Sequence, residues 1–107
     1  MTNKIFNKVC IYGAGAIGGW IGARLAKAGS EVSVVARGKT LDALKAHGLR
    51  LNSGGTVTTS AVTASANPAD LGVQDLVVIA VKAPALLDVA RQITPLIGPD
   101  TVVLTAM

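Results

Sequence analysis

The stretch IYGAGAIGGW, Ile11 to Trp20, places four glycines among ten residues. It continues an apolar run that begins at Val9, which is typical of a buried strand in a parallel sheet. From Ala16 onward the apolar residues recur at helical spacing, so the glycines lie between a strand and a helix. Two interpretations are open: a loop that lets a phosphate approach the backbone, or a flexible turn between two buried elements.

Three of these glycines have the spacing of a dinucleotide-binding turn. Gly13, Gly15 and Gly18 match Gly-x-Gly-x-x-Gly, with a strand before the motif, a helix after it and a second strand further on. The first glycine allows the tight turn, the second lets a pyrophosphate reach the backbone, and the third lets the helix pack closely on the sheet. Free N–H groups at the helix start favour a diphosphate. The predicted phosphate-binding residues are Gly13, Ala14, Gly15, Ala16, Ile17 and Gly18.

Two more glycines, Gly19 and Gly22, lie inside the predicted helix. Glycine within a helix costs up to about 1 kcal/mol relative to alanine. Their presence therefore indicates close contact between the helix backbone and a neighbouring strand, helix or ligand. Trp20, which lies between them, is predicted to pack in the core; the alternative is that it faces a domain outside this chain.

Cations follow the second strand and a later one. Arg37 ends the run EVSVVA, at the place where an acidic residue would meet a ribose 2′-hydroxyl and an arginine would meet a 2′-phosphate. A guanidinium can bind a phosphate through paired charge-assisted hydrogen bonds, so Arg37 favours NADP over NAD. Lys82 directly follows LVVIAV, at the sheet edge where ligands of such folds bind. It is predicted to contact cofactor phosphate or ribose; a merely solvated side chain is the alternative for both cations.

Strands and helices alternate along the chain, which predicts βαβ units and a mostly parallel, doubly wound Rossmann-like sheet with helices on both faces. Gly29 is the predicted C-terminal cap of the first helix, while Thr40 and Gly48 are the N-cap and stop of the second. The expected helices span residues 16–28, 41–47 and 84–97, the last with Leu86, Ala90, Ile93 and Ile97 on its apolar face. The expected strands span residues 9–12, 31–36, 49–52, 56–62, 75–81 and 101–107.

Composition limits the function classes. The chain has 107 residues, 50% of them hydrophobic, with a mean hydropathy of +0.54, which indicates one compact α/β domain. Although the net charge is +4, the cations are scattered and aromatic residues make up 3%, so a nucleic-acid partner is not expected. No apolar run is long enough to cross a bilayer and the first residues lack a signal-peptide core, so we expect no membrane partner and a cytoplasmic location.

The residues with reactive side chains do not form a recognisable catalytic or metal site. Cys10 is the only cysteine and is predicted to be a reduced, buried thiol. His47 is the only histidine, and its position at a helix end favours a surface or capping role over acid–base catalysis. The six carboxylates show no close pairing, and no Cys/His cluster has metal-ligand spacing. We therefore predict no catalytic residue and no metal ligand in this chain.

Three segments together resemble a known family. GAGAIGG after the first strand, VVARG at the end of the second and LVVIAVKA before the last helix make the chain similar to the N-terminal domain of ketopantoate reductase (2-dehydropantoate 2-reductase) from Lys8 onward. The resemblance implies NADPH-dependent reduction of ketopantoate to pantoate, in the pantothenate pathway, by hydride transfer. It places Arg37 on the 2′-phosphate and Lys82 near the adenosine. Ala85 stands where the family often has a glutamine, which puts one phosphate contact in doubt.

The resemblance also bears on domain organisation. Residues 1–107 correspond to the dinucleotide-binding domain, cut short at its C-terminal end, of a longer two-domain protein. An Asn-Gly pair beyond Met107 and a helical domain, which supplies the proton-donating lysine and the groups that hold the keto acid, would lie outside the chain. The fragment alone is then expected to be inactive. A homodimer is left open.

Two other functions are consistent with the sequence. The first is another NADP-dependent dehydrogenase of similar layout, acting on a different 2-keto acid or on an opine. The second is a dinucleotide-sensing Rossmann module that regulates a partner without chemistry of its own. A purely structural subunit fits poorly, because ligand approach is the simplest explanation for this density of glycines.

Overall fold

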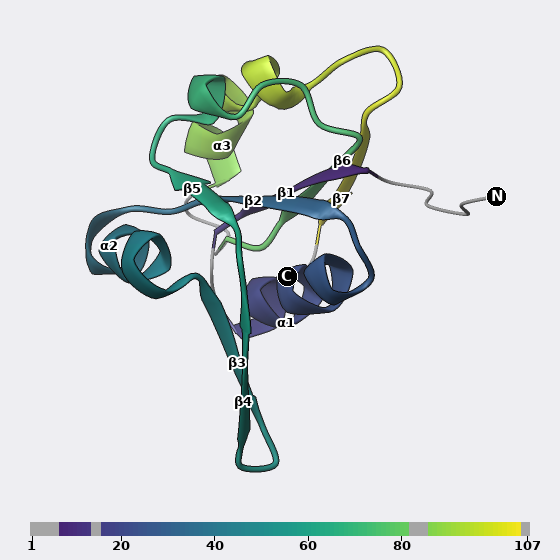
Figure 1. Cartoon of the computed structure of the whole chain (residues 1–107). Helices are drawn as coiled ribbons and strands as arrows, with labels where there is room; N and C mark the ends of the chain where they lie inside the picture. Colours follow the sequence, from purple (N-terminus) through teal and green to yellow (C-terminus); the bar gives the residue numbers. More distant parts are fainter. Residues whose placement is uncertain (1–6, 14–15, 82–85, 106–107) are drawn as a thin grey trace, which may run out of the picture.

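The computed structural model of the chain describes residues 7–13, 16–81 and 86–105. A five-stranded parallel sheet forms the centre, in the order β5-β2-β1-β6-β7, and a two-stranded antiparallel hairpin projects from it (Figure 1). This confirms the predicted doubly wound α/β fold. In chain order the elements are β1 Lys8–Tyr12, α1 Ala16–Lys27, β2 Glu31–Val35, α2 Gly38–His47, β3 Leu49–Ser53, β4 Thr56–Ser60, β5 Thr63–Ser65, the 3₁₀ helix η1 Pro68–Asp70, β6 Leu76–Ile79, α3 Leu86–Gln92, the 3₁₀ helix η3 Thr94–Leu96 and β7 Val102–Thr105.

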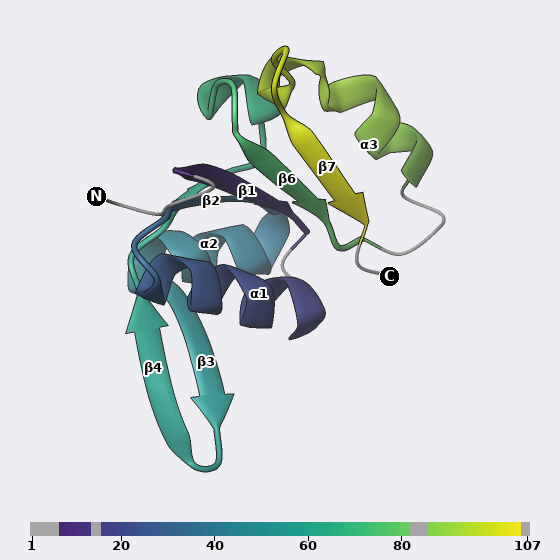
Figure 2. The ribbon, with the colours of Figure 1, turned by 90° about the vertical axis from the view of Figure 1, so that its right-hand side faces the viewer.

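Helices cover both faces of the sheet (Figures 1 and 2). Alternate residues of a strand point to opposite faces, and β1 uses both. Val9 and Ile11 pack with residues of α1 and α2 in one core cluster, which also holds Val32, Val34, Ala23 and Leu44. Cys10 and Tyr12 pack on the other face with Val35 and Val77 of the neighbouring strands, with Val89 of α3 and with Leu96 of η3. The continuous apolar run of β1 is therefore explained by burial on both sides.

The first helix ends as the sequence predicts. Gly29 has φ +100, its N–H donates to the carbonyl of Ala26 at 3.0 Å, and the N–H of Ser30 donates to the carbonyl of Leu25 at 3.0 Å. This pair of bonds is the Schellman arrangement, in which a left-handed glycine satisfies the last helical carbonyls. The helix then turns directly into β2.

The second helix begins earlier than predicted. Its N-cap is Arg37, with no side-chain capping bond, and helix α2 starts at Gly38, so the assignment of Thr40 as N-cap is wrong. Gly38 has φ +61, and the N–H of Leu41 already donates to the carbonyl of Arg37. Glycine permits this sharp turn straight from the strand. Gly48 ends the helix as predicted, with its N–H bonded to the carbonyl of Leu44.

The predicted hairpin is present as β3 and β4. Ser53 pairs with Thr56, and Gly54 and Gly55 between them both have positive φ, as the common two-residue hairpin turn requires. The predicted strand 56–62 stops at residue 60, however, and the separate strand β5 was missed. β5 pairs in parallel with β2 and forms one edge of the main sheet.

The last predicted helix is shorter than the apolar pattern indicates. Helix α3 ends at Gln92, and Pro95 lies in the following 3₁₀ helix. Proline has no N–H and disfavours helical geometry in the residue before it, so the α-helix cannot continue to residue 97. Ile93 packs against the core as predicted, but Ala90 and Ile97 are exposed and Val89 and Leu96 are buried, so the predicted apolar face is only partly right. Pro84 lies outside the described residues.

Three single-residue predictions have mixed outcomes. Cys10 is a fully buried free thiol and His47 is exposed at the end of α2, as predicted. Trp20 is 49% exposed, with the guanidinium of Arg24 over its ring at 4.8 Å, so it does not pack in the core.

The residues of β7 are exposed, which corrects the prediction of a buried strand at 101–107. In the described part of the chain, no helix has the length and apolar character to cross a membrane.

Candidate functional site

The site begins where β1 and β6 end side by side. Strand β1 pairs with β2 on one side and β6 on the other, so the order of the strands reverses between β1 and β6. Ligands of open parallel sheets bind outside the carboxyl ends of the strands at such a point. The predicted glycine motif lies here, since Gly13 directly follows β1.

Gly13 makes a turn that no other residue type fits. It has φ +97, its N–H donates to the carbonyl of Val35 at 2.9 Å, and a Cβ built on it would lie 2.7 Å from Cγ1 of Val81. The turns after β1 and β6 thus touch at Gly13. A side chain there would be strained by the backbone and would also collide with the neighbouring turn.

Gly18 brings helix α1 against the sheet. A Cβ at this position would lie 2.7 Å from the carbonyl oxygen of Gly13, 2.9 Å from the Cβ of Ala80 and 3.0 Å from Ile11. Gly22 has the same character one turn later, because a Cβ there would lie 3.1 Å from Ile11 and from Leu49. The predicted close packing is therefore present at Gly18 and Gly22. At Gly19 the nearest atom would be 3.9 Å away, an ordinary contact.

The start of α1 has the electrostatic character that an anion needs. Ala16 and Ile17 are its first two residues, and its first turn contains no acidic residue. The first N–H groups of a helix have no partner within it and lie at the positive end of its dipole. Ala14 and Gly15, which complete the predicted phosphate-binding set, lie outside the described residues, and so does Lys82.

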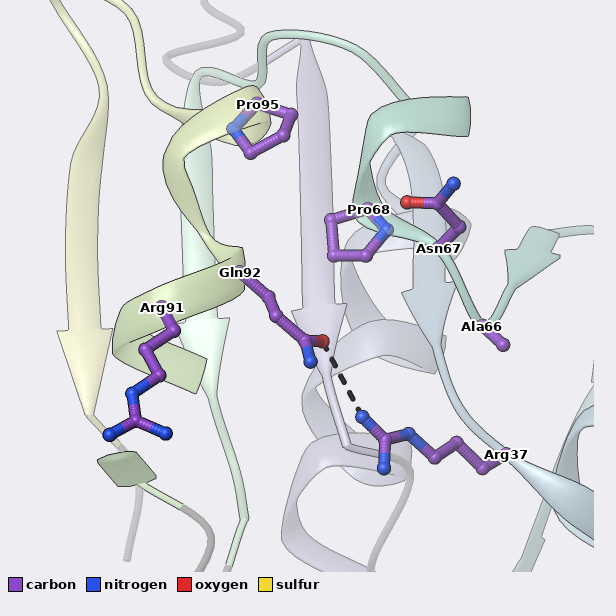
Figure 3. A pocket seen from close by; sticks show the side chains of 7 residues that line it. All are labelled: Arg37, Ala66, Asn67, Pro68, Arg91, Gln92 and Pro95. Atoms are coloured by element: carbon purple, nitrogen blue, oxygen red, sulfur yellow. Dashed lines mark hydrogen bonds between the residues drawn. The ribbon is translucent and has the colours of Figure 1, made fainter. Parts of the chain in front are cut away.

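Arg37 extends from the end of β2 across the end of β1. Its backbone is extended, and its Nη2 donates to Oε1 of Gln92 at 3.4 Å (Figure 3). The side chain is exposed, and among the described residues no carboxylate forms an ion pair with it. Its positive charge is therefore free to meet an anion at the carboxyl edge of the sheet.

Tyr12 connects this cation to the core. It is the last residue of β1, its side chain is 6% exposed, and its hydroxyl donates to the same Oε1 of Gln92 at 3.1 Å. Burial is the main reason that the pKa of Tyr12 is raised above its ordinary value of 10.0, and the nearby Arg37 partly opposes the rise. The hydroxyl thus remains protonated at neutral pH and can act as a donor.

A cavity of about 420 Å³ opens beside Arg37, between α3 and the turn that follows β5 (Figure 3). Two prolines form its apolar end, and two arginines and two amides supply its polar groups. Its lining residues are Arg37, Ala66, Asn67, Pro68, Arg91, Gln92 and Pro95. Asn67 also caps η1, with its Oδ1 accepting from the N–H of Ala69. A cavity of this size and charge suits part of an anionic organic molecule.

The structure brings some of the predicted residues together. Gly13 and Gly18 are in direct contact at the end of β1, and Arg37 follows β2, whose last residue Val35 is paired with Tyr12. His47 lines a different cavity of about 190 Å³, formed by α2 and the start of β3. In the described ranges no three His, Cys, Asp or Glu side chains gather closely enough to hold a metal ion.

Sequence reasoning missed Tyr12, Gln92, Asn67 and Arg91. Tyr12 carried a usable signal, because a tyrosine directly before the first glycine places a polar group at the carboxyl end of the central strand. Gln92 and Arg91 carried none, since their position depends on where α3 ends. Asn67 belongs to the segment after β5, a strand that was itself missed.

Comparison with known proteins places the chain among reductases. The protein-family model described as "Ketopantoate reductase PanE/ApbA" matches residues 9–107. A curated 2-dehydropantoate 2-reductase of Mesorhizobium japonicum is 48% identical over 99 residues, which cover 92% of this chain and 30% of that protein.

Solved structures agree with this placement. A crystal structure described as a putative ketopantoate reductase from Ralstonia solanacearum has 55% identity and a TM-score of 0.90, and the match covers 94% of this chain and 32% of that one. A ternary structure of D-mandelate dehydrogenase with NADH and anilino(oxo)acetate has 29% identity and a TM-score of 0.82, with coverage of 92% and 32%. The chain thus spans about a third of the length of these relatives.

Proposed function

The chain belongs to the ketopantoate reductase family, and we propose that the intact protein reduces ketopantoate to pantoate with NADPH, a step of the pantothenate pathway. Residues 1–107 serve as its cofactor-binding domain. A helical domain beyond residue 107 supplies the proton donor and the groups that hold the keto acid. By itself the 107-residue chain binds cofactor and does not turn over substrate.

The observation that supports this proposal most strongly is the position of the Arg37 guanidinium and the absence of a carboxylate beside it among the described residues. The guanidinium follows β2 at the carboxyl edge of the sheet, has no carboxylate partner among the described residues and borders the 420 Å³ cavity. An NAD-specific site would have an acidic side chain here, which would repel a 2′-phosphate. A free guanidinium suits that phosphate in both charge and geometry.

The glycine turn is proposed to hold the pyrophosphate, in the middle of the same cofactor. Gly13 makes the turn, with its own N–H bonded to the carbonyl of Val35, and the backbone N–H groups of Ala14, Gly15, Ala16, Ile17 and Gly18 bind the pyrophosphate. Lys82 contacts phosphate or ribose. When bound, the nicotinamide supplies the hydride. This chain's residues hold and orient the cofactor; none of them is proposed to move the substrate proton.

A substrate assay tests the proposal. The intact protein is mixed with NADPH, and absorbance at the nicotinamide band is followed after ketopantoate is added. We expect ketopantoate-dependent oxidation of NADPH. Normal NADPH binding without oxidation would contradict the proposed substrate, while leaving the cofactor assignment in place.

A second candidate is reduction of another 2-keto acid. The similarity to D-mandelate dehydrogenase, whose structure contains NADH and an aryl oxoacetate derivative, favours this alternative. The same assay with benzoylformate, and with NADH in place of NADPH, distinguishes the two. Faster turnover of benzoylformate with NADH would support the alternative and argue against a role of Arg37 in cofactor choice.

A further inference from the structure

We propose that Gln92 is a positioning residue for cofactor selection: it holds the Arg37 guanidinium over the end of β1, where a 2′-phosphate can reach it. This inference rests on the proposed function, because it assumes that Arg37 binds that phosphate. Cofactor choice would then depend on two residues: Arg37 at the end of β2, and Gln92 on α3, which lies 55 positions away in the sequence.

The orientation of the Gln92 amide follows from its partners. A guanidinium has donors and no acceptor, so the atom of Gln92 that faces Arg37 must be the oxygen. The Tyr12 hydroxyl, 3.1 Å from that same oxygen, must then donate to it. One oxygen thus accepts from two donors, the part-buried Tyr12 hydroxyl and the exposed Arg37 guanidinium. Figure 3 shows the bond to Arg37.

Tyr12 anchors the Gln92 end of this arrangement. Its side chain is 6% exposed and packs in the core cluster formed with α3, while its backbone leads directly into Gly13. Gln92 is therefore fixed by a residue that also sets the glycine turn. Through Gln92, the position of the cation is tied to the position of the phosphate-binding backbone.

Glutamine suits position 92 because its side-chain amide carries no charge. A carboxylate at position 92 would pair with Arg37 and offset its charge, and it would repel a bound phosphate. An amide oxygen holds the guanidinium by a hydrogen bond and leaves its charge unpaired. The bond, at 3.4 Å, is at the long end for a hydrogen bond, so a phosphate can still draw the guanidinium toward itself.

The test compares Gln92→Leu with Ala90→Ser, a control at an exposed position of the same helix. Dissociation constants for NADPH and NADH are measured on the intact protein by calorimetry, together with the thermal midpoint. We expect Gln92→Leu to weaken NADPH binding about three- to tenfold and to leave NADH binding unchanged, because only NADPH uses the positioned cation. Equal weakening of both cofactors, or of neither, would overturn the inference.

Two further variants show whether Gln92 acts through Arg37. In an Arg37→Ala background, Gln92→Leu should have no further effect on NADPH binding, since the group it positions is gone. Gln92→Glu should weaken NADPH binding more than Gln92→Leu does, because the new carboxylate pairs with the cation. Additive effects of Arg37→Ala and Gln92→Leu would contradict positioning.

The inference and the proposed function fail in different ways. If Arg37→Ala leaves the preference for NADPH unchanged, the assignment of the 2′-phosphate to Arg37 is wrong and the role of Gln92 falls with it. If Arg37→Ala abolishes the preference but Gln92→Leu does not alter it, only the role of Gln92 is wrong.

Discussion

The two ends of the candidate site are held in different ways. At the glycine turn, backbone atoms and neighbouring side chains leave no space for a Cβ, and Gly13 and Gly18 would each bring one within 2.7 Å of another atom. At the Arg37 end, an exposed side chain reaches toward the end of β1 and makes one hydrogen bond, of 3.4 Å, with a described residue. The first end is part of the folded core, and the second is an adjustable surface group.

Because of this difference, substitutions at the two ends should affect different properties: folding at the glycine turn and the choice of cofactor at Arg37. A substitution at the glycine turn must disturb the packing of α1 on β1, so it changes folding and phosphate binding together. A substitution at Arg37 removes a charge that the fold does not need. The half proposed to bind the pyrophosphate is therefore expected to resist change, whereas the half proposed to choose between NADPH and NADH is expected to change without loss of the fold.

The largest effect is expected at Gly18. In Gly18→Ala the new Cβ would lie 2.7 Å from the backbone oxygen of Gly13, which cannot move away as a side-chain end could. We expect a loss of about 2–4 kcal/mol of unfolding free energy, measured by urea denaturation. The matched control is Gly19→Ala, where the nearest atom is 3.9 Å away.

Gly19→Ala should stabilise the protein by up to about 1 kcal/mol, because alanine favours the helix more than glycine does. The two adjacent substitutions are therefore expected to have opposite signs. Similar effects at both positions would mean that the close approach of α1 to the sheet does not restrict the residue type at Gly18.

A smaller effect is expected from the strand that leads into the glycine turn. Burial raises the pKa of the Cys10 thiol from its ordinary value of 9.0 to about 12. Because the folded pKa is higher, the stabilisation is complete below pH 9 and is lost as the pH rises toward 12. Between pH 9 and 10.5 this group should cost about 1–2 kcal/mol of unfolding free energy.

Comparison with Cys10→Ala isolates the thiol from the other groups that titrate in this range. Urea denaturation at several pH values should show a flatter profile for the variant than for the starting protein. Parallel profiles would mean that Cys10 is solvated, and that β1 is less tightly covered than the structure indicates.

The smallest effect on stability is expected at Arg37. Among the described residues, the one hydrogen bond that its side chain makes is long and exposed, so Arg37→Ala should change the unfolding free energy by no more than about 0.5 kcal/mol. A loss above 2 kcal/mol in urea denaturation would show that the cation supports the fold, and the contrast between the two ends of the site would then be wrong.

The sequence predicts the centre of the fold well, and the reason is physical. β1 and β6 are apolar runs buried on both faces, and the glycine spacing between β1 and α1 has few structural solutions. Gly29 and Gly48 are helix stops because their left-handed conformations are available to glycine at low cost. Local chemistry decides each of these features.

Features that depend on tertiary contacts were not predictable in this way. β7 has the same apolar character as β1, yet Val102, Val103 and Leu104 are 45–50% exposed because β7 is the edge strand of the sheet. Trp20 lies on an exposed part of α1, although its size favoured the core. The site shows the same division: Arg37 could be found from its place after β2, whereas Gln92 depends on how α3 packs over the sheet.

The central claim is that the Arg37 guanidinium, which has no carboxylate partner among the described residues, selects a cofactor with a 2′-phosphate. Calorimetric titration of the intact protein and of Arg37→Ala with NADPH and NADH tests it directly. We expect tighter binding of NADPH by the starting protein, with this preference reduced about 10- to 100-fold in the variant and NADH binding unchanged. Equal affinity of the starting protein for both cofactors would contradict it.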